Sequence, residues 1–415
     1  MTSSVPAREP GERAAPRRAL VSGASIAGLA TAFWLERIGW RVDVVERAAE
    51  FREGGQNVDV RGAARAVVDR MGLRERVRDL TTTEEGTRFV DGEGGTVGEF
   101  PAREGHDGPT AELEILRGDL AGAVRDSLGD AVTLRFGDTV AAVDDAAAPA
   151  PVHVTFASGR EGDYDLVVVA EGVRSATRDL VLPAEEIHRD PLDLAIVYGT
   201  IPRTDDDDRW WRWYTATDQR QVTLRPDNVG TIRATLAWLT DRSDLAAAPR
   251  AQRDRVLREV FAGAGWQTER VLAGLSTSED VYLDHLTQIR LDHWSRGRVV
   301  VVGDAAWCVT PVGGGGSSLA LLGGYVLAAS LSTAADLATG LREFEAWLRP
   351  VVEDTQKLPP GVPRLVYPRS ALGVGVLRAG VRLASSAPVR RIAGRILGSA
   401  GESERELPAI TLARS

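Results

Sequence analysis

The stretch from residue 18 to residue 47, RALVSGASIAGLATAFWLERIGWRVDVVER, decides the fold. It opens with a short apolar run and a glycine turn, GASIAG, at 23–28, which together predict a strand and a sharp bend. A second apolar run at 42–45 predicts another strand, and it ends at Glu46. Between the turn and that strand, small or apolar side chains repeat at helical spacing: Gly28, Ala32, Leu35 and Gly39. The stretch therefore predicts a strand, a helix and a second strand in one unit.

Each glycine of this turn has a physical role in binding a dinucleotide. Gly23 lets the chain turn tightly, Gly28 lets helix and strand approach, and the free N–H groups at the helix start suit a pyrophosphate. Ser25 replaces the middle glycine of the G-x-G-x-x-G pattern with a small side chain that can donate a hydrogen bond. Glu46 follows Gly28 by 18 residues, where an acid accepts hydrogen bonds from ribose hydroxyls. An ordinary strand-turn-helix unit explains the glycines alone, but the acid at this distance favours a dinucleotide site.

Composition narrows the class of protein. The 415 residues, of which 43% are hydrophobic, exceed what one core usually organises, so more than one structural unit is expected. A formal net charge of −9 argues against nucleic acid and anionic membranes as partners, because both attract basic surfaces. The apolar segment 317–332 is too short for a membrane span and predicts a buried helix. Cys308 is the only cysteine and the five histidines lack ligand spacing, so a cytoplasmic protein without a disulfide or metal site is expected.

The pattern of strands and helices predicts an α/β fold with two parts. A continuous apolar run at 166–169 suits a strand buried on both faces, whereas the strands between 191 and 284 alternate. We therefore expect a Rossmann-like domain, an inserted and mostly antiparallel β-sheet domain, and a C-terminal helical segment. We expect a disordered tail at 1–17 and the first domain at 18–190, which includes a hairpin near 87–100 that belongs to the second sheet. The inserted sheet is expected at 191–284, the return of the first domain at 285–349 and the helical layer at 350–415.

Three separated motifs, in this order, resemble those of a known family. The glycine turn with Glu46 and Arg47 comes first, DLVVVAEG at 165–172 second, and GDAA at 303–306, followed by Pro311 and further glycines, third. The chain resembles the single-component aromatic hydroxylases among the FAD-dependent monooxygenases, a group that includes p-hydroxybenzoate hydroxylase and the tetracycline-inactivating enzymes. The resemblance covers nearly the whole chain beyond the tail. It implies FAD as the cofactor, NADPH or NADH as the reductant, an FAD-binding first domain and a substrate-binding sheet.

The resemblance also implies contacts with the cofactors. Arg47 would lie along the adenosine, Arg117 would contact the FAD, and Asp59 would lie near the flavin. Asp304 would bind the ribityl hydroxyls, although an aspartate there also suits a helix N-cap. Arg52 is the candidate for nicotinamide binding, and it equally fits a solvated loop. The expected FAD contacts, including the start of a helix whose positive end would face the flavin, are Gly23, Ser25, Gly28, Glu46, Arg47, Asp59, Arg117, Asp304, Pro311, Gly314 and Gly316.

Substrate contacts are expected on the tryptophan-rich sheet, which forms the wall over the flavin ring in this family. Strand alternation puts Trp211 and Trp213 on one face, although core packing is the alternative for each aromatic side chain. No side chain is assigned a catalytic role, because the flavin carries the chemistry. The expected substrate contacts are Trp211, Trp213, Arg220, Trp238 and Trp307.

Three residues depart from the family pattern near the cofactor. Glu171 stands where an aspartate is usual, Trp307 where many members have histidine, and Gly315 where many have glutamine. The resemblance implies that the enzyme, a monomer or homodimer, hydroxylates or epoxidises a polycyclic or polyketide-like molecule through a flavin hydroperoxide. The departures leave an alternative, an FAD-binding cyclase that folds a polyene or polyketide without net redox change. A flavin-dependent halogenase is disfavoured because Lys357, near the end of the chain, is the only lysine.

Overall fold

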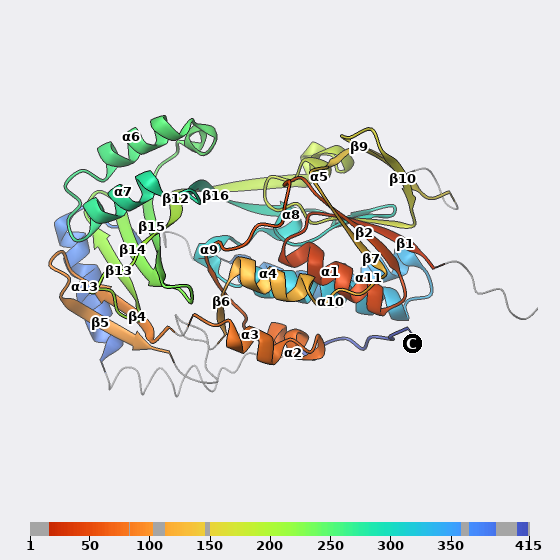
Figure 1. The fold of residues 1–415 in the computed structure, drawn as a ribbon, viewed down its shortest axis with the longest axis horizontal. Helices are drawn as coiled ribbons and strands as arrows, with labels where there is room; N and C mark the ends of the chain where they lie inside the picture. Colours follow the sequence, from red (N-terminus) through yellow and green to blue (C-terminus); the bar gives the residue numbers. More distant parts are fainter. Residues whose placement is uncertain are drawn as a thin grey trace, which may run out of the picture.

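In the computed structural model, residues 18–169 and the later segment 295–301 supply the strands of a six-stranded, largely parallel sheet (Figure 1). The structure describes residues 16–82, 84–102, 113–145, 150–357, 365–386 and 405–413. The strands of this sheet are β1 (Arg18–Ser22), β2 (Arg41–Glu46), β7 (Val132–Phe136), β11 (Leu166–Val169), β17 (Ser295–Arg296) and β18 (Val299–Val301). Their order is β17-β18-β11-β1-β2-β7. β1 lies between β2 and β11, parallel to both, so their carboxyl ends meet along one edge.

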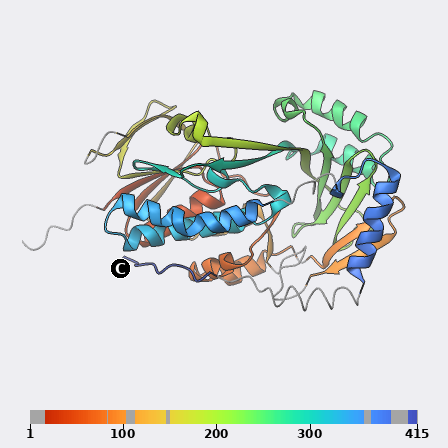
Figure 2. The same ribbon diagram turned by 180° about the vertical axis from the view of Figure 1, so that it is seen from behind.

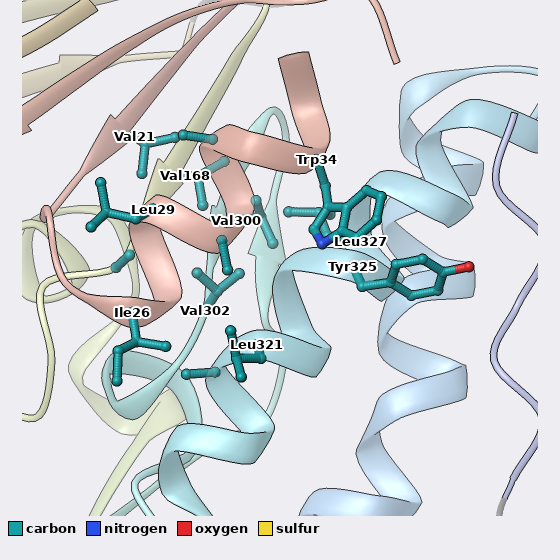
Figure 3. Close-up of a cluster of buried hydrophobic side chains, with 14 of the residues drawn as sticks. Val21, Ile26, Leu29, Trp34, Val168, Val300, Val302, Leu321, Tyr325 and Leu327 are labelled. Carbon is teal, nitrogen blue, oxygen red and sulfur yellow. The ribbon is translucent and has the colours of Figure 1, made fainter. Parts of the chain in front are cut away.

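Two helices, far apart in the sequence, pack together against this sheet (Figure 3). They are α1 (Ile26–Arg37), which follows the glycine turn, and α10 (Gly316–Thr333). Gly324 lets the helices approach closely, because a Cβ there would lie 2.7 Å from the Thr31 amide nitrogen. α10 has the length and hydropathy of a membrane span, but most of it is buried inside the protein. The apolar segment is therefore a core helix, as its sequence predicts.

Shorter elements surround this core. A two-stranded ladder joins β3 (Asn57–Asp59) to β6 (Glu114–Leu116). A three-stranded sheet consists of β8 (Val140–Asp144), β9 (Val152–Phe156) and β10 (Glu161–Tyr164), with β9 in the middle. The helices are α2 (Ala63–Arg70), α3 (Arg74–Asp79), α4 (Arg117–Arg125), α5 (Ala176–Val181), α8 (Asp304–Trp307), α9 (Thr310–Gly313) and α11 (Leu337–Gln356).

A seven-stranded sheet forms the second part of the molecule. Its strands are β4 (Gly86–Val90), β5 (Thr96–Pro101), β12 (Ile187–Pro202), β13 (Trp210–Ala216), β14 (Arg220–Pro226), β15 (Thr231–Leu239) and β16 (Tyr282–Leu291). They lie in the order β16-β12-β15-β14-β13-β4-β5. Every neighbouring pair is antiparallel except β13 and β4, so the prediction of a mostly antiparallel sheet is confirmed. α7 (Thr268–Thr277) packs on β12 and β15, α6 (Arg250–Val260) packs on α7, and α13 (Ala371–Ser385) packs on β5 and β13.

The two long strands β12 and β16 join the two parts of the molecule (Figure 1). The predicted limits at 190 and 284 fall inside these strands, so neither is a linker. The predicted limit at 350 falls inside α11, which continues through Pro350. The proline does not end the helix because an apolar face that includes Phe344, Leu348 and Val352 is buried on both sides of it. The domain limits as a whole remain a proposal.

The described C-terminal residues do not all form a helical layer. Residues 405–413 have no helix and return to the first domain, where the Tyr325 hydroxyl donates to the Pro408 carbonyl at 2.7 Å. Figure 2 shows this dark blue segment running beside the α10 and α11 side of the molecule. The predicted tail at 1–17 lies outside the described residues except for Pro16 and Arg17.

Candidate active site

One cavity of about 1940 Å³ extends from the glycine turn to the face of the second sheet. Its walls include the carboxyl ends of β1 and β2 on one side and side chains of β12 to β16 on the other. Sites for a single small ligand usually measure about 300–1,000 Å³. The cavity therefore has room for a dinucleotide and a second ligand beside it.

The glycine turn has no space for larger residues. Gly23 has φ of +110°, and a Cβ there would lie 2.4 Å from the Ala170 carbonyl oxygen. A Cβ at Gly28 would lie 1.8 Å from the Gly23 carbonyl oxygen. The Gly23 amide donates to the Val45 carbonyl at 2.8 Å, which fixes the turn against β2. The geometry fits a tight turn at Gly23 and a close approach at Gly28, the roles that the sequence predicts.

Two polar side chains border this turn. Glu46 accepts hydrogen bonds from the amides of Ala24 at 2.9 Å and Ala48 at 3.0 Å, and it lines the cavity. Ser25 accepts a hydrogen bond at 3.0 Å from Nη1 of Arg117, the first residue of α4. Three predicted site residues from distant parts of the chain are thus brought together at the turn.

The loop after β2 passes beside the same place. The Gly118 amide donates to the Gly54 carbonyl at 2.6 Å, so the loop is fixed to the start of α4. Arg47 and Arg52 are exposed and line the cavity rim. Asp59 also lines the cavity, and its side chain forms an ion pair with Arg61. The backbone carbonyl of Asp59 accepts a hydrogen bond at 3.1 Å from the Ser318 hydroxyl of α10.

Asp304 begins α8 where β18 ends, and its side chain opens to the cavity. Burial by the surrounding protein raises the pKa of the Asp304 carboxyl; Arg117 opposes this rise and the negative charge of Asp284 adds to it. Pro311, Gly314 and Gly316 line the cavity beyond Asp304. Positive φ angles at Gly314 and Gly315 turn the chain into α10, whose first turn carries no acidic residue. The positive end of α10 therefore faces this region.

Glu171, the first departure from the family pattern, has its carboxylate held by the protein. It accepts hydrogen bonds from the hydroxyls of Ser22, Ser175 at 2.8 Å and Thr177 at 2.6 Å, and from the Thr177 amide at 3.0 Å. These bonds connect the ends of β1 and β11 to the start of α5. The longer acid therefore braces the strand ends at the cavity.

The second sheet presents an aromatic patch to the cavity. Trp211 and Trp213 of β13 both line it, with ring centroids 4.7 Å apart, and Phe89 of β4 lies 5.7 Å from Trp213. Strand alternation puts both tryptophans on one face, as the sequence predicts. Their role as substrate contacts remains a proposal.

Three other predicted substrate contacts lie elsewhere, which corrects the expectation for them. Arg220 and Trp238 are on the opposite face of the sheet, where Arg220 donates to the Val260 carbonyl at 2.9 Å and Trp238 packs on Phe261. Both are even-numbered residues on strands whose odd-numbered residues face the cavity. Trp307 is buried in the first core against Trp294, with ring centroids 4.4 Å apart. None of the three lines the cavity in the described structure.

Several cavity residues were not among the predicted contacts. All of them except Tyr367 lie on strands and alternate there with core residues, but that pattern shows only which residues share a face. It does not show which face meets the cofactor domain. The side chains concerned are Tyr198, Tyr282, Asp284 and Tyr367. Arg225 and Arg233, for which the sequence allows either a hold on substrate oxygens or an exposed strand position, are buried and line the cavity.

The fold and the site together define a dinucleotide-binding class of protein whose cavity has room for a second ligand. A family model described as the FAD binding domain matches residues 17–344, and the chain belongs to this family. The tight turn at Gly23, where no Cβ fits beside the Ala170 carbonyl, and the polar groups of Glu46, Arg117 and Asp304 along the same cavity suit FAD. The protein is thus an FAD-dependent oxidoreductase of the flavin-dependent monooxygenase family.

Its relatives agree with this assignment. The chain is 34% identical to the flavin-dependent monooxygenase eupH of Phoma sp, over 91% of this chain and 94% of the relative. It is 33% identical to monooxygenase CTB7 of Cercospora beticola, over 91% and 94%. Among solved structures, tetracycline destructase Tet(51) has a TM-score of 0.77 and 29% identity, over 95% of this chain and 99% of that chain. Klebsiella pneumoniae HpxO complexed with FAD and uric acid shares the fold, with a TM-score of 0.71 and 21% identity over 92% and 95%.

Proposed function

We propose that this enzyme uses NADPH or NADH and molecular oxygen to hydroxylate or epoxidise a planar polycyclic or polyketide-like molecule. The observation that carries the proposal is the single cavity that joins the glycine turn to the aromatic patch of Phe89, Trp211 and Trp213. Bound FAD supplies the redox chemistry, taking electrons from the nicotinamide and activating oxygen. The protein contributes binding, orientation and exclusion of water.

Several predicted residues would each have a role on the cofactor side of this cavity. The helix start after Gly23 and Ser25 would bind the pyrophosphate, Glu46 the ribose, and Asp304 the ribityl hydroxyls. Arg117, already oriented by Ser25, would add a donor close to the pyrophosphate. Partial positive charge at the start of α10 would stabilise negative charge on a reduced ring system next to it.

The substrate side is built for a flat, largely apolar molecule. Aromatic rings of the patch offer stacking surfaces, and Leu194, Ile196 and Leu286 add apolar lining. An apolar and enclosed site slows the entry of water and the loss of reactive oxygen species. Relatives named monooxygenases include eupH and CTB7, and this supports the same reaction class here.

The cyclase alternative has less support from the site. It rests on the departures at Glu171, Trp307 and Gly315, yet Trp307 lies in the core and Glu171 is held by hydroxyls of the protein. In the described part of the structure, Glu171 and Gly315 line the cavity, whereas Trp307 does not. We also propose a cytoplasmic location, because Cys308 is the only cysteine and the chain therefore has no internal disulfide. In solution we propose a monomer or a homodimer.

Oxygen-18 labelling tests the proposed reaction. The holoenzyme is incubated with a panel of aromatic polyketides, NADPH and oxygen-18 gas, and products are analysed by mass spectrometry. We expect one labelled oxygen atom in the product and bleaching of the flavin absorbance when NADPH is added anaerobically. A product of unchanged mass, formed equally without NADPH or oxygen, would contradict the proposal and support the cyclase.

A further inference from the structure

Two arginines lie side by side on the cavity face of the second sheet. Arg225 of β14 and Arg233 of β15 are direct cross-strand partners, and both line the cavity. Arg225 is 8% exposed and Arg233 is 5% exposed. Like charges directly opposite one another destabilise a sheet, so other contacts must stabilise this pair.

Carboxylates hold the guanidinium group of Arg225. Nε donates to Glu84 at 2.7 Å, and Nη2 contacts Glu114 of β6 in the first part of the molecule. The guanidinium carbon lies 3.9 Å from the ring centroid of Trp211, a cation–π distance. These contacts orient Arg225 beside the aromatic patch.

Carboxylates hold Arg233 in the same way. Nε donates to Asp227 at 3.1 Å, and Nη1 donates to the Thr200 hydroxyl at 2.6 Å and to Asp280 at 3.2 Å. Each of the two guanidinium groups therefore contacts two carboxylates of the protein. Its positive charge is matched before any ligand arrives.

One nitrogen of each group remains for a ligand. Across the described part of the chain, Nη1 of Arg225 and Nη2 of Arg233 donate to no protein acceptor, and neither is enclosed by protein. The next cross-strand pair, Thr223 and Thr235, has its hydroxyls bonded to one another at 2.7 Å. The arginines thus offer N–H donors whose positive charge is already paired with carboxylates of the protein. They lie next to the Thr223–Thr235 pair on the cavity face of the sheet.

We infer that Arg225 and Arg233 form a substrate subsite for neutral oxygen acceptors, such as the carbonyl oxygen of a ring ketone, and that this subsite disfavours carboxylates. A carbonyl gains N–H···O bonds and brings no charge. A carboxylate would add a negative charge beside carboxylates that already hold the guanidinium groups. The inference rests on the proposed function, since it takes the cavity to be the substrate site.

Three probes with the same ring test the subsite on the unaltered, oxidised holoenzyme. They are 2-acetylnaphthalene, which carries a ketone, 2-ethylnaphthalene, which replaces the carbonyl by hydrocarbon, and 2-naphthoate. Dissociation constants come from the change in flavin absorbance. We expect the ketone to bind about tenfold more tightly than the hydrocarbon, the effect of one or two added hydrogen bonds, and more tightly than the carboxylate. Equal binding of ketone and hydrocarbon, tighter binding of 2-naphthoate, or no binding of any probe would overturn the inference.

Variants then assign the preference to the arginines. Arg225→Lys and Arg233→Lys keep the charge that the carboxylates need but remove the second donor nitrogen. Each should reduce the preference for the ketone severalfold, and the binding of 2-ethylnaphthalene should not change. Arg212→Lys, on the opposite face, is the matched control and should retain the preference. The measurement uses neither NADPH nor turnover, so a failure of the oxygen-insertion experiment leaves this result interpretable on its own.

Discussion

Glu46 holds the glycine turn in place through the amide of Ala24, whose nitrogen lies 2.9 Å from Oε2. Its other carboxylate oxygen accepts from the Ala48 amide at 3.0 Å. A carboxylate has about four acceptor positions, so these two bonds leave capacity for ribose hydroxyls. The acid is therefore oriented by the turn next to it before a nucleotide binds.

Replacing this acid tests its role in binding the ribose. Glu46→Gln should weaken FAD binding about fivefold, because bonds to an ionised acceptor are stronger than bonds to an amide oxygen. The measurement is a titration of the apo-protein with FAD, in which the quenching of flavin fluorescence reports binding. Glu75→Gln on the exposed surface of α3 is the control and should bind FAD like the unaltered protein. An unchanged dissociation constant for Glu46→Gln would show that the acid only braces the turn.

Adding one methyl group to the turn should remove flavin binding. Gly23→Ala places a Cβ 2.4 Å from the Ala170 carbonyl oxygen at a φ of +110°, so the backbone of the turn must move. We expect little FAD in the purified variant and a lower melting temperature. Gly380→Ala in α13 is the matched control: no described atom beyond the neighbouring backbone of its own helix lies within 4 Å of its new Cβ, and alanine should stabilise the helix by about 0.5–1 kcal/mol. Normal flavin content in Gly23→Ala would contradict the proposed turn geometry.

The Asp304 carboxylate should lower the stability of the apo-protein and strengthen the binding of FAD. Its pKa is raised from the ordinary 3.8 mainly by burial, so the folded apo-protein binds this proton more tightly than the unfolded chain does. The ionised side chain therefore destabilises the apo-protein above its folded pKa, and this penalty fades as pH falls toward 3.8. Asp304→Asn should raise the melting temperature of the apo-protein at pH 7 and yet weaken FAD binding.

Melting temperatures measured over a range of pH test whether the ionised Asp304 side chain destabilises the apo-protein. The difference in melting temperature between Asp304→Asn and the unaltered apo-protein should be largest near neutral pH and should shrink on acidification. A difference that grows on acidification would mean that the carboxylate stabilises the fold. Asp304→Ala should contain no flavin while the fold survives, and full flavin content in that variant would contradict the proposed ribityl contact.

The two faces of the second sheet should respond differently to mutation. Trp211→Leu and Trp213→Leu should each weaken binding of 2-acetylnaphthalene severalfold and leave FAD affinity unchanged, since an aromatic contact contributes about 0.5–1.5 kcal/mol beyond its buried area. Trp238→Leu, on the opposite face, should lower the melting temperature and leave probe affinity unchanged. Unchanged probe affinity in both cavity-face variants would show that Trp211 and Trp213 only contribute to packing.

The sequence by itself determined the first strand, the glycine turn and the acid after the second strand. These features lie within 30 residues, and local sterics and spacing control them: no side chain fits at Gly23, and the helix begins three residues later, at Ile26. Three motifs in order likewise predicted the return of the chain to β18 and Asp304, because each motif marks the carboxyl end of a buried parallel strand.

Tertiary structure alone decided which side chains meet the second ligand. Alternation placed Trp211 with Trp213, but only the cross-strand pairing of Arg220 with Trp238 and the packing of Trp238 on Phe261 show that this second pair lies on the opposite face. Long-range contacts also decided that Glu171 accepts a hydrogen bond from Ser22 at the end of β1, and that Arg225 meets Glu114 from another part of the chain. Such contacts join residues far apart in sequence, and no local pattern encodes them because they exist only after the two sheets have packed on one cavity.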